Sequence, residues 1–348
     1  MPFLFLVALL LSTPFVADAA AKKRSIDTTR YAEVCTALNR SHYPPLKPND
    51  KRRHKALASI IEASGVQNLL LKESPRLKAA CWIMYDDSAK LSAGDPRLLE
   101  RYALAVLYHA TQGMQWTRST KWLTGAHEGK WEGITISRPT FLSVKKRITS
   151  IKLPFNKVNG ILPRELSLLT EMRVLDLHGN DLQGVLPHKA LTDWKKLEVL
   201  ELHMNNILGK IPTEIGMMKN LKELHLFGTY IEGPLPRRIG ELQKLEYLDV
   251  SFTYMSGSVP SELGNAMNLR EVYLNDCDFK GQIPSTLCKL PHLQELWADC
   301  LGPSPEVSCQ CPTVCSRGLP DPKQVDMRKF RGGGGKTGGK KKRKGKKK

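Results

Sequence analysis

One segment of this sequence recurs six times between residues 148 and 292. The copies share the pattern LxxLxLxxNxLxGxIPxxLGxL, as in MRVLDLHGNDLQGVLP and LEVLELHMNNILGKIP, and a truncated copy, LQELWADC, follows them. Their closing prolines lie 24 residues apart, with one interval of 25: Pro163, Pro187, Pro212, Pro236, Pro260 and Pro284. A unit of this length cannot bury its apolar face alone, so successive copies must stack and share one core.

Each copy predicts one coil of the stack. The LxL alternation indicates a short strand whose leucines, such as Leu175 and Leu177, point inward while the residue between them points outward. The Asn position of the pattern is expected to bond backbone groups left unpaired where the strand turns. That position holds Asn156, Asn180, Asn205, Thr229, Thr253 and Cys277. A Gly then permits a tight bend, and the Pro begins the convex side.

The pattern identifies a leucine-rich-repeat solenoid, and its GxIPxxLGxL half resembles the plant-type subclass, which includes receptor-kinase ectodomains and polygalacturonase-inhibiting proteins. The resemblance implies an α/β solenoid: a horseshoe of six full 24-residue repeats and a partial seventh, with a helical N-terminal cap and a Cys-rich C-terminal cap. It also implies that the protein is not an enzyme, because plant-type repeat proteins that lack a kinase generally act by binding. No cofactor is expected.

Residues 95–147 predict the N-terminal cap. Asp95 and Pro96 are expected to begin a helix over LLERYALAVLYHAT. We expect the side chains of Trp116, Trp122 and Trp131 to pack on the first coil. The alternative is that these tryptophans are exposed and stack on a ligand. With AACWIMYDDS before it, this segment is most similar to the leucine-rich-repeat ectodomains abundant in diatoms. That family has a cysteine pair around its WxGV segment, where this chain has Gly129 and Ile136, so the cap is expected to hold by packing alone.

Residues 20–94 form an N-terminal helical region whose role the sequence does not reveal. KRRHKALASIIEASGVQNLLL and SPRLKAACWIMYDD predict short helices, the second capped by Ser74 with Pro75 at its first position. Cys35 and Cys81 could pair across this region.

Residues 293–318 predict the C-terminal cap, which resembles that of the same family and is closed by disulfides. The candidates are Cys288, Cys300, Cys309, Cys311 and Cys315, with Cys277 either free or the sixth partner, and sequence alone does not fix the connectivity. Zinc binding by Cys309, Cys311 and Cys315 is the alternative.

Residues 1–19 predict an export signal. An apolar run from Phe3 to Leu11 precedes Ala17-Asp18-Ala19, where we expect cleavage, with an uncleaved signal anchor as the alternative. Asn39-Arg40-Ser41 is then a glycosylation acceptor, at Asn39, and eight cysteines suit an oxidising compartment. The expected location is secreted, extracellular or at the cell surface.

The sequence offers no catalytic constellation. Gly335-Lys336-Thr337 imitates the end of a phosphate-binding loop, but Phe330 stands where that loop needs its first Gly. His178 and His203 occupy the same outward position in adjacent coils, with His225 one column over in the next. Metal binding or a pH-sensitive contact is conceivable there, but solvated histidines are favoured, and no metal ligands are assigned.

The outward positions of the strands predict the binding site. Exposed aromatic side chains among acids on a rigid concave face suit a protein or peptide ligand, or a glycan. The predicted contact residues are Asp176, His178, Glu201, His203, His225, Phe227, Tyr247, Asp249, Phe252, Tyr273 and Trp297. The alternative is that these side chains cover the sheet and bind nothing.

Residues 319–348 form a basic tail expected to be disordered. The formal net charge is +19, and ten Lys or Arg from Arg331 onward carry about half of it. The residues expected to bind polyanions are Lys340, Lys341, Lys342, Arg343, Lys344, Lys346, Lys347 and Lys348. Outside the cell, they would retain the protein on acidic polysaccharide, anionic lipid or silica. The rival hypothesis is an intracellular or nuclear scaffold whose tail binds nucleic acid or serves as a localisation signal.

Overall fold

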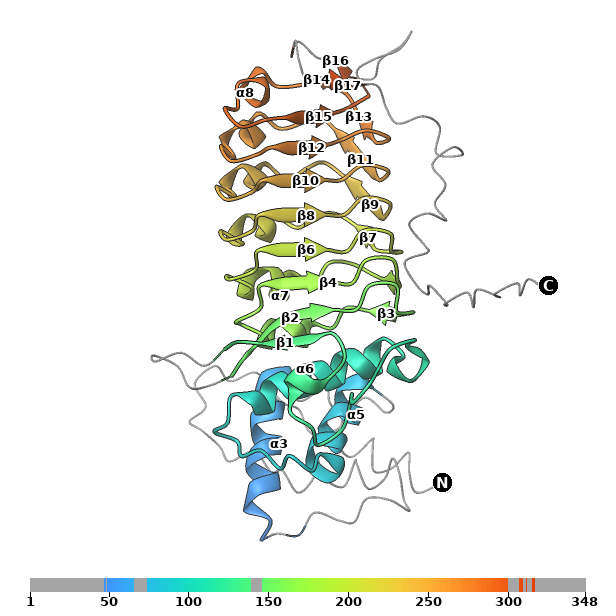
Figure 1. The fold of residues 1–348 in the computed structure, drawn as a ribbon, viewed down its shortest axis with the longest axis vertical. Coiled ribbons are helices and arrows are strands. Elements are labelled where there is room, and N and C mark those ends of the chain that lie inside the picture. The colour runs from blue at the N-terminus through green and yellow to red at the C-terminus, as the bar shows by residue number, and fades with distance from the viewer. Residues whose placement is uncertain are drawn as a thin grey trace, which may run out of the picture.

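The computed structural model describes residues 47, 49–65, 74–138, 146–299, 307–308, 311 and 315–316. They form a stack of parallel coils on a base of short helices (Figure 1). The signal segment, Asn39, Cys35, Cys300, Cys309 and the basic tail lie outside these residues, so the predictions made for them stay predictions.

Every coil contributes one short strand to a nine-stranded sheet that runs along the stack. The first pair, β1 and β2, is antiparallel, and each later neighbour is parallel, as the stacking of repeats requires. The sheet order is β1 (Ile134–Ile136), β2 (Ile148–Lys152), β4 (Val174–Asp176), β6 (Val199–Glu201), β8 (Glu223–His225), β10 (Tyr247–Asp249), β12 (Glu271–Tyr273), β15 (Glu295–Trp297) and β17 (Cys315–Ser316).

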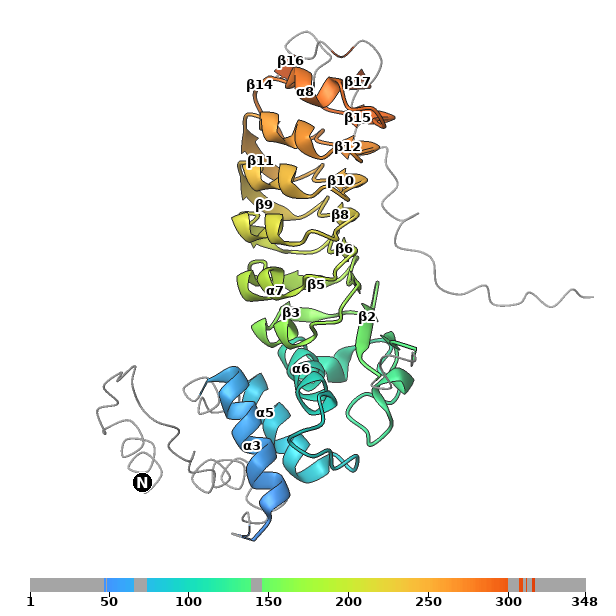
Figure 2. The same ribbon diagram turned by 90° about the vertical axis from the view of Figure 1, so that its left-hand side faces the viewer.

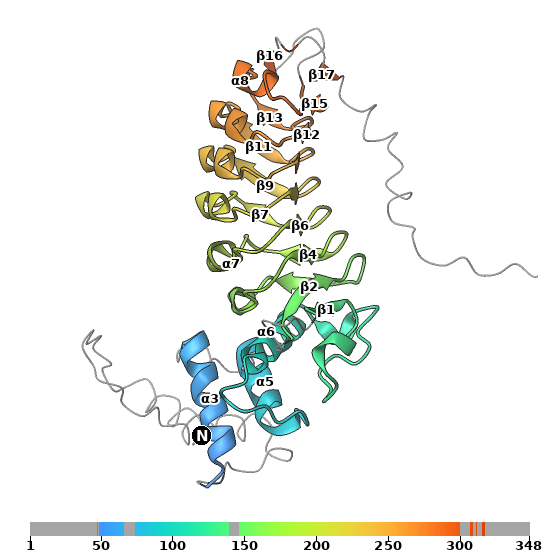
Figure 3. The same ribbon diagram turned by 60° about the vertical axis from the view of Figure 1, so that its left-hand side comes forward.

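The opposite side of each coil begins at the closing proline. All six prolines that close the repeats directly precede a helical turn, and these turns line the convex side in Figures 2 and 3. The turns are η4 (Arg164–Leu168), α7 (His188–Asp193), η5 (Thr213–Met217), η6 (Arg237–Glu241), η7 (Ser261–Asn265) and α8 (Ser285–Cys288). Proline suits the position before a helical turn because its ring fixes φ and because it has no backbone N–H group that would need a hydrogen-bond partner.

Short strands between the two sides pair along the stack as well. β7 (Leu208–Gly209), β9 (Tyr230–Gly233), β11 (Tyr254–Gly257) and β13 (Asp278–Phe279) form one sheet. Two further pairs are β3 (Asn159–Ile161) with β5 (Asp181–Gln183), and β14 (Gly281–Gln282) with β16 (Val307–Ser308). Gly209 and Gly233 bend these strands at φ 80° and 77°, values that side-chain-bearing residues rarely adopt.

The core is one continuous column of leucines and other apolar side chains between the sheet and the convex turns. Leu175, Leu200, Leu224 and Leu248, which occupy the middle position of successive strands, have no exposed surface. The inward direction of the LxL pair is therefore as predicted from its alternation.

The Asn position of the repeat ties adjacent coils together. The Oδ1 atom of Asn180 accepts hydrogen bonds from the backbone N–H groups of Asn156 and Val158, at 2.8 and 3.0 Å. Its Nδ2 atom donates to the carbonyls of Leu153 and Leu177. Thr229 donates to a carbonyl of its own coil. Thr253 does the same, and its Oγ1 atom lies 3.4 Å from Sγ of Cys277 in the next coil, so hydroxyl and thiol contacts replace the amide bonds toward the C-terminal end.

The helical base contains α3 (Lys51–Ser64), α5 (Pro75–Cys81), a π-helical turn η1 (Trp82–Asp86) and α6 (Arg97–Ala110). The side chain of Ser74 caps α5 and Pro75 occupies its first turn, as predicted. Two short 3₁₀ turns follow, η2 (Gly113–Gln115) and η3 (Glu128–Lys130). Figure 2 shows α3 and α5 beneath the first coil, next to α6.

The three tryptophans predicted to pack are buried. Trp116 and Trp122 meet edge to face at 4.8 Å, and the ring of Trp131 lies 5.3 Å from that of Trp122. Asn156 connects this region to the first coil, because its amide donates to the carbonyl of Arg118 and accepts from the N–H of the same residue. The alternative of ligand-stacking tryptophans is therefore wrong.

The expectation that packing alone holds this region is also wrong. Arg101 has no exposed surface, and its guanidinium donates to the carboxylates of Asp87 and Glu128, at 2.7 Å each, and to two carbonyls. The same group lies over the rings of Trp82 and Trp131, at 5.3 and 4.9 Å. Gly129 and Ile136, which replace the family's cysteine pair, lie in contact, since a Cβ atom on Gly129 would fall 2.8 Å from Ile136.

Two of the predicted disulfide candidates bond to each other at the C-terminal end. Cys288 pairs with Cys311, with Cα atoms 5.3 Å apart, so the alternative of zinc binding through Cys311 is excluded. Cys277 is a free thiol, and its burial raises its pKa to about 11. Cys81 takes part in a disulfide, while its predicted partner Cys35 is not among the described residues. Cys315 lies in β17, and its side chain is not described.

Within the described part of the chain, no helix combines the length and the apolar character needed to cross a membrane.

Candidate ligand-binding face

The outward face of the nine-stranded sheet, here called the concave face, carries columns of side chains fixed by the strand register. One column occupies the last position of successive strands: Lys152, Asp176, Glu201, His225, Asp249, Tyr273 and Trp297. A second lies two residues earlier in each strand: Ser150, Val174, Val199, Glu223, Tyr247, Glu271 and Glu295. The third lies just beyond the strands and contains His178, His203 and Phe227.

Aromatic rings of the third column stack across three coils, and Phe155 of the first coil adjoins them. The ring of Phe155 meets His178 edge to face at 4.8 Å, and His178 stacks on His203 at 4.4 Å with only 9° between the ring planes. His203 stacks in turn on Phe227, also at 4.4 Å. The three predicted contact residues His178, His203 and Phe227 are thus brought together, half-buried rather than fully solvated.

A second run of rings continues toward the C-terminal end. His225 stacks on Tyr247 at 4.3 Å, Tyr247 lies 5.4 Å from Tyr273, and Tyr273 lies 6.1 Å from Trp297. His203 and His225, 5.8 Å apart, join the two runs. Because the coils rise at regular sheet spacing, one aromatic residue per coil is enough to make a continuous strip.

Carboxylates orient the rings of this second run. The hydroxyl of Tyr273 lies 2.9 Å from Glu271 and 2.8 Å from Glu295, and the indole N–H of Trp297 donates to Glu295 at 3.2 Å. Burial and these acceptors raise the pKa of Tyr273. Glu295 is exposed, so it can also meet a positively charged partner. The sequence reasoning missed Glu271 and Glu295, although their alternation with Tyr273 in the strand pattern could have indicated them.

Two predicted contact residues are not available to a ligand. Asp176 and Asp249 are each only 7% exposed. Asp249 accepts hydrogen bonds from the N–H and hydroxyl of Ser251, and Asp176 lies 2.7 Å from Nδ1 of His178. The expectation of exposed acids is therefore wrong at these positions, because the residue two positions after each carboxylate bonds to it.

The pKa values of the two stacked histidines are shifted in opposite directions, although both residues hold the same position in the repeat. Partial burial disfavours the charged form of His178, but hydrogen bonds to Asp176 and Glu201 outweigh it and raise its pKa to about 9. Burial and the adjacent His178 and His225 lower the pKa of His203 to about 4. At neutral pH a charged imidazolium therefore stacks on a neutral imidazole. The hydrogen bond to His178 also lowers the pKa of Glu201.

A groove of about 940 Å³ runs beside the concave face, where the chain turns from the main sheet to the short strands. Phe155, Met204 and Phe252 line it at left-handed backbone positions, with φ between 50° and 55°. Tyr230 and Tyr254 stand on its other side, more than half exposed and stacked at 6.0 Å. The predicted contact residue Phe252 therefore belongs to this groove rather than to the sheet surface.

Charged residues at the start of the strands neutralise one another. Glu198 accepts hydrogen bonds from Arg173 and Lys222, at 2.5 and 2.9 Å, and these lower its pKa. Arg270 pairs with Glu246 at 3.3 Å. This edge of the concave face carries alternating charges that partner each other across coils, so it presents no field of one sign to a ligand.

Comparison with known proteins identifies the repeat region. Residues 149–316 match the family model for a leucine-rich repeat region. No curated protein is significantly similar to the chain in sequence.

Several solved structures resemble the fold. The ectodomain of the Arabidopsis receptor kinase HAESA, solved with the peptide hormone IDA and the co-receptor SERK1, has a TM-score of 0.50 and 26% identity over 59% of this chain and 33% of that chain. Pollen Receptor Kinase 3 has a TM-score of 0.49 and 23% identity, over 61% and 96%. The SOBIR1 ectodomain of Arabidopsis thaliana has a TM-score of 0.44 and 22% identity, over 52% and 96%.

The chain spans about a third of the HAESA chain and almost all of the two shorter ones. The repeat pattern, the parallel sheet and the matched family model agree with one another. Residues 149–316 therefore form a leucine-rich repeat region, similar to that of a plant receptor kinase.

Proposed function

We propose that this chain is an exported, non-catalytic recognition protein that binds a protein or peptide, or a glycan, on its concave face. The observation that carries the proposal is the continuous strip of rings His225, Tyr247, Tyr273 and Trp297, one from each successive coil. Large rigid rings supply contact area with little loss of conformational entropy, and they dominate the energetics of binding surfaces.

The charges around this strip favour a partner with basic side chains. Glu223, Glu271 and Glu295 share the column next to the rings, and Glu295 is exposed. A Lys or Arg side chain of a bound peptide could contact a ring face and a carboxylate at once, and both contacts favour a cation. Of the two partner classes, these features suit a polypeptide better than a neutral glycan.

The likeness to HAESA supports a peptide partner at the level of fold. HAESA is bound to the peptide hormone IDA and the co-receptor SERK1 in the matching structure. This chain covers only a third of HAESA, so the peptide and the co-receptor of HAESA are not transferred to it. What the likeness supports is a peptide as the class of ligand for a fold of this kind.

The basic tail is proposed to retain the protein on an anionic surface such as acidic polysaccharide, anionic lipid or silica. Lys340 to Lys348 hold eight basic residues in nine positions, and such a segment binds polyanions through counterion release without a defined fold. Recognition and retention would then reside in different parts of the chain. Deleting residues 340–348 should abolish salt-sensitive retention at the cell surface and leave ligand binding intact, whereas loss of both would contradict this division.

The binding proposal is tested on immobilised arrays of basic peptides, acidic peptides and glycans. Tyr273→Ala and Trp297→Ala should each weaken the binding of basic peptides by roughly 10-fold to 30-fold, as expected for a residue at the centre of a binding surface. Tyr230→Ala is the matched control, because Tyr230 is an exposed tyrosine that lies in the groove and not on the concave face.

Three outcomes separate the possibilities. If the Tyr273 and Trp297 variants bind basic peptides more weakly and the Tyr230 variant binds them as the original chain does, the result supports the concave site. Weakening by Tyr230→Ala alone moves the site to the groove. Binding of glycans and not of peptides, with the same dependence on Tyr273, keeps the face but replaces the partner class.

The location is tested by intact-mass and N-terminal analysis of the protein from its own cells. A chain that begins at Ala20, carries a glycan at Asn39 and has most cysteines oxidised supports export. A chain that begins near Met1, without a glycan and with reduced thiols, would overturn it in favour of the intracellular scaffold whose tail binds nucleic acid.

A further inference from the structure

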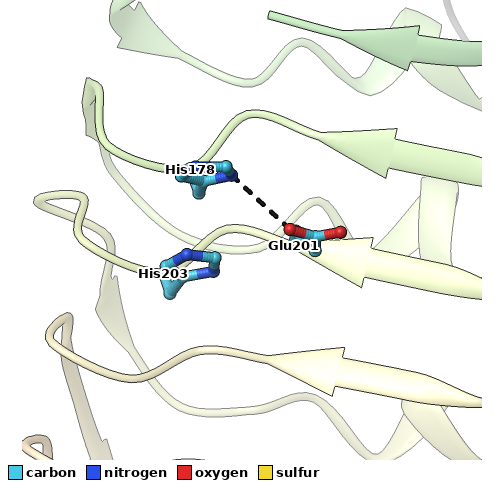
Figure 4. Close-up of side chains that lie close together, drawn as sticks. All are labelled: His178, Glu201 and His203. Carbon is cyan, nitrogen blue, oxygen red and sulfur yellow. Dashed lines mark ion pairs between the residues drawn. The ribbon is translucent and has the colours of Figure 1, made fainter. Parts of the chain in front are cut away.

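Three donor side chains from two adjacent coils converge on the concave face. His178 follows β4, and Glu201 and His203 lie at and just after the end of β6. Their ligand atoms all lie within 4.8 Å of one another, and Nδ1 of His178 is 3.5 Å from Oε2 of Glu201. Figure 4 shows both imidazoles lying one above the other, with the Glu201 carboxylate facing their nitrogen-bearing edges.

The backbone holds these donors in place without a ligand. The carbonyl of His178 accepts from the N–H of Phe155, and the carbonyl of His203 accepts from that of Gly179, at 3.0 Å each. The amides of Asn180 and Asn205 donate to the same two carbonyls. Because the backbone bonds of this ladder continue through the following coils, the spacing of the two histidines is a property of the solenoid and is set before any ligand binds.

One nitrogen in this group lacks a partner. Nδ1 of His203 is buried, and none of the described residues makes a hydrogen bond to it. A buried polar atom without a partner is uncommon in folded proteins, and an ion is one of its ordinary explanations. Asp176 lies 2.7 Å from the same Nδ1 atom of His178 that faces Glu201, so it adds a second carboxylate beside the group.

We propose that His178, His203 and Glu201 form a binding site for a divalent transition-metal ion of the zinc class. Two imidazoles and one carboxylate are a donor set that Zn²⁺ takes in proteins, with further coordination positions left for water or a ligand atom. The apolar rings of Phe155 and Phe227 flank the pair and limit the access of water from both sides. The site lies beyond the proposed peptide strip and does not depend on it.

The structure also defines what the ion must displace. Without metal, an ion pair between His178 and the carboxylates of Asp176 and Glu201 holds the group together. The two rings are almost parallel, so they must turn toward each other for their lone pairs to meet at one ion, which costs part of the stacking contact. Two nitrogen donors select against Mg²⁺ and Ca²⁺, which prefer oxygen ligands.

The sequence prediction assigned no metal ligands on this face and treated the histidines as solvated. It recognised that His178 and His203 share a position, but it did not combine them with Glu201. The coil offset that places Glu201 beside His178 of the preceding coil is visible in the strand register.

The test is calorimetric titration of the full chain, without an affinity tag and after treatment with a chelator, with Zn²⁺ alone in a non-coordinating buffer. The expected result is one bound ion per chain. His178→Ala and His203→Ala should each weaken Zn²⁺ binding at least about 10-fold, the loss typical of removing a coordinating or orienting group. His292→Ala is the matched control, because His292 is an exposed histidine outside the concave face, and it should bind Zn²⁺ like the original chain.

Two further variants keep the result interpretable. Cys277→Ser removes the free thiol and should leave Zn²⁺ binding unchanged. Circular dichroism and thermal unfolding in the absence of metal should show that the His178 and His203 variants remain folded, and added Zn²⁺ should raise the melting temperature of the original chain only. The proposal would be overturned if the original chain did not bind Zn²⁺. It would also be overturned if a variant without both histidines bound Zn²⁺ as tightly as the original chain, or if the original chain bound Ca²⁺ as tightly as Zn²⁺. None of these measurements uses a peptide, so they are independent of the proposed function.

Discussion

A residue on a repetitive scaffold takes its properties from the neighbouring coils as much as from its own. His178 and His203 occupy equivalent positions, yet the pKa of the first is raised to about 9 and that of the second lowered to about 4. His178 has carboxylates from its own and the next strand beside it, whereas His203 lies between two other imidazoles. The repeat sets their spacing, and the side chains of adjacent coils set their charge.

His109 at the end of α6 makes the stability of the helical base depend on pH. Its burial, with Lys78 nearby, lowers its pKa to about 4, and its Nε2 atom is buried without a hydrogen-bond partner among the described residues. The unfolded chain binds a proton at this residue near pH 6.5, while the folded chain does not until about pH 4. His109 therefore lowers the stability as the pH falls from 6.5 toward 4, and has no such effect above 6.5.

We expect His109→Gln to remove on the order of 1–2 kcal/mol of the stability difference between about pH 7 and about pH 5. Urea unfolding at the two pH values measures this difference. The exposed His292 supplies the control, since His292→Gln should leave the pH dependence unchanged. An unaltered pH dependence in the His109 variant would show that this histidine is not held neutral in the folded protein.

Arg101 illustrates a residue whose role the sequence did not reveal. Helical periodicity places it within α6, but an arginine in an amphipathic helix is normally expected on the solvent side. Here Asp87 and Glu128, 14 and 27 positions away, accept its hydrogen bonds in the interior. Only the folding of separate segments around α6 brings these carboxylates together.

The elements of the solenoid are joined by side-chain amides as well as by the sheet. Asn205 accepts from the N–H of Leu182 and donates to the carbonyls of Leu177 and Leu202, so it links two coils. Thr229, at the same position one coil later, donates to the carbonyl of Leu226 in its own coil. Within the described part of the chain, Asn205 and Thr229 therefore compare one position of the repeat with and without side-chain hydrogen bonds between coils.

Asn205→Ala should cost about 2–4 kcal/mol, because it leaves several buried backbone groups without partners, and Thr229→Ala only about 1 kcal/mol. Chemical denaturation of both variants measures the two losses. Equal losses would contradict the idea that bonds between coils, rather than the position in the repeat, account for the effect.

The segment before the repeats is an element whose place the sequence left open. Glu165 in η4, on the convex side of the first coil, accepts hydrogen bonds from Arg76 of α5 at 2.6 Å and from Ser64 of α3 at 3.3 Å. Ser64 also bonds with Tyr102 of α6, and its carbonyl accepts from Arg164. These contacts indicate that α3 and α5 extend the cover over the first coil, a role we infer for them from the packing.

The whole molecule is a stack in which each coil contacts mainly its neighbours, so damage at one end should remain local. The disulfide between Cys288 of α8 and Cys311 fastens the C-terminal end, next to the pairing of β14 with β16. Figure 1 shows α8 at the end of the stack opposite the helical base.

Replacing both cysteines with serine should speed amide hydrogen exchange in α8, β14 and β15 and leave β4 and β6 unchanged. The physical reason is that the disulfide limits the unfolded states of the last coils, while the central coils keep both neighbours. Exchange measured by mass spectrometry on peptic fragments reports each region separately. A uniform increase along the chain would show that the molecule unfolds as one cooperative unit.

The sequence by itself determined the coil, because a 24-residue period with inward leucines has one way to bury its apolar side chains, and the register then follows from the repeat. It predicted the outward columns, the ladder at the Asn position and the convex turns after each proline. It could not determine which outward side chains remain accessible. Asp176 and Asp249 were expected on the surface and are buried, whereas the carboxylate of Glu201 lies beside two stacked histidines.

Only the tertiary structure decided which outward side chains are buried and which carboxylates pair with Arg101. These contacts join residues whose spacing along the sequence does not follow the repeat. Burial, pKa and ion pairing depend on the side chains that adjacent coils and the base place around a residue. The repeat determines the position of each residue in its coil, and the packing of the folded chain determines which side chains it contacts.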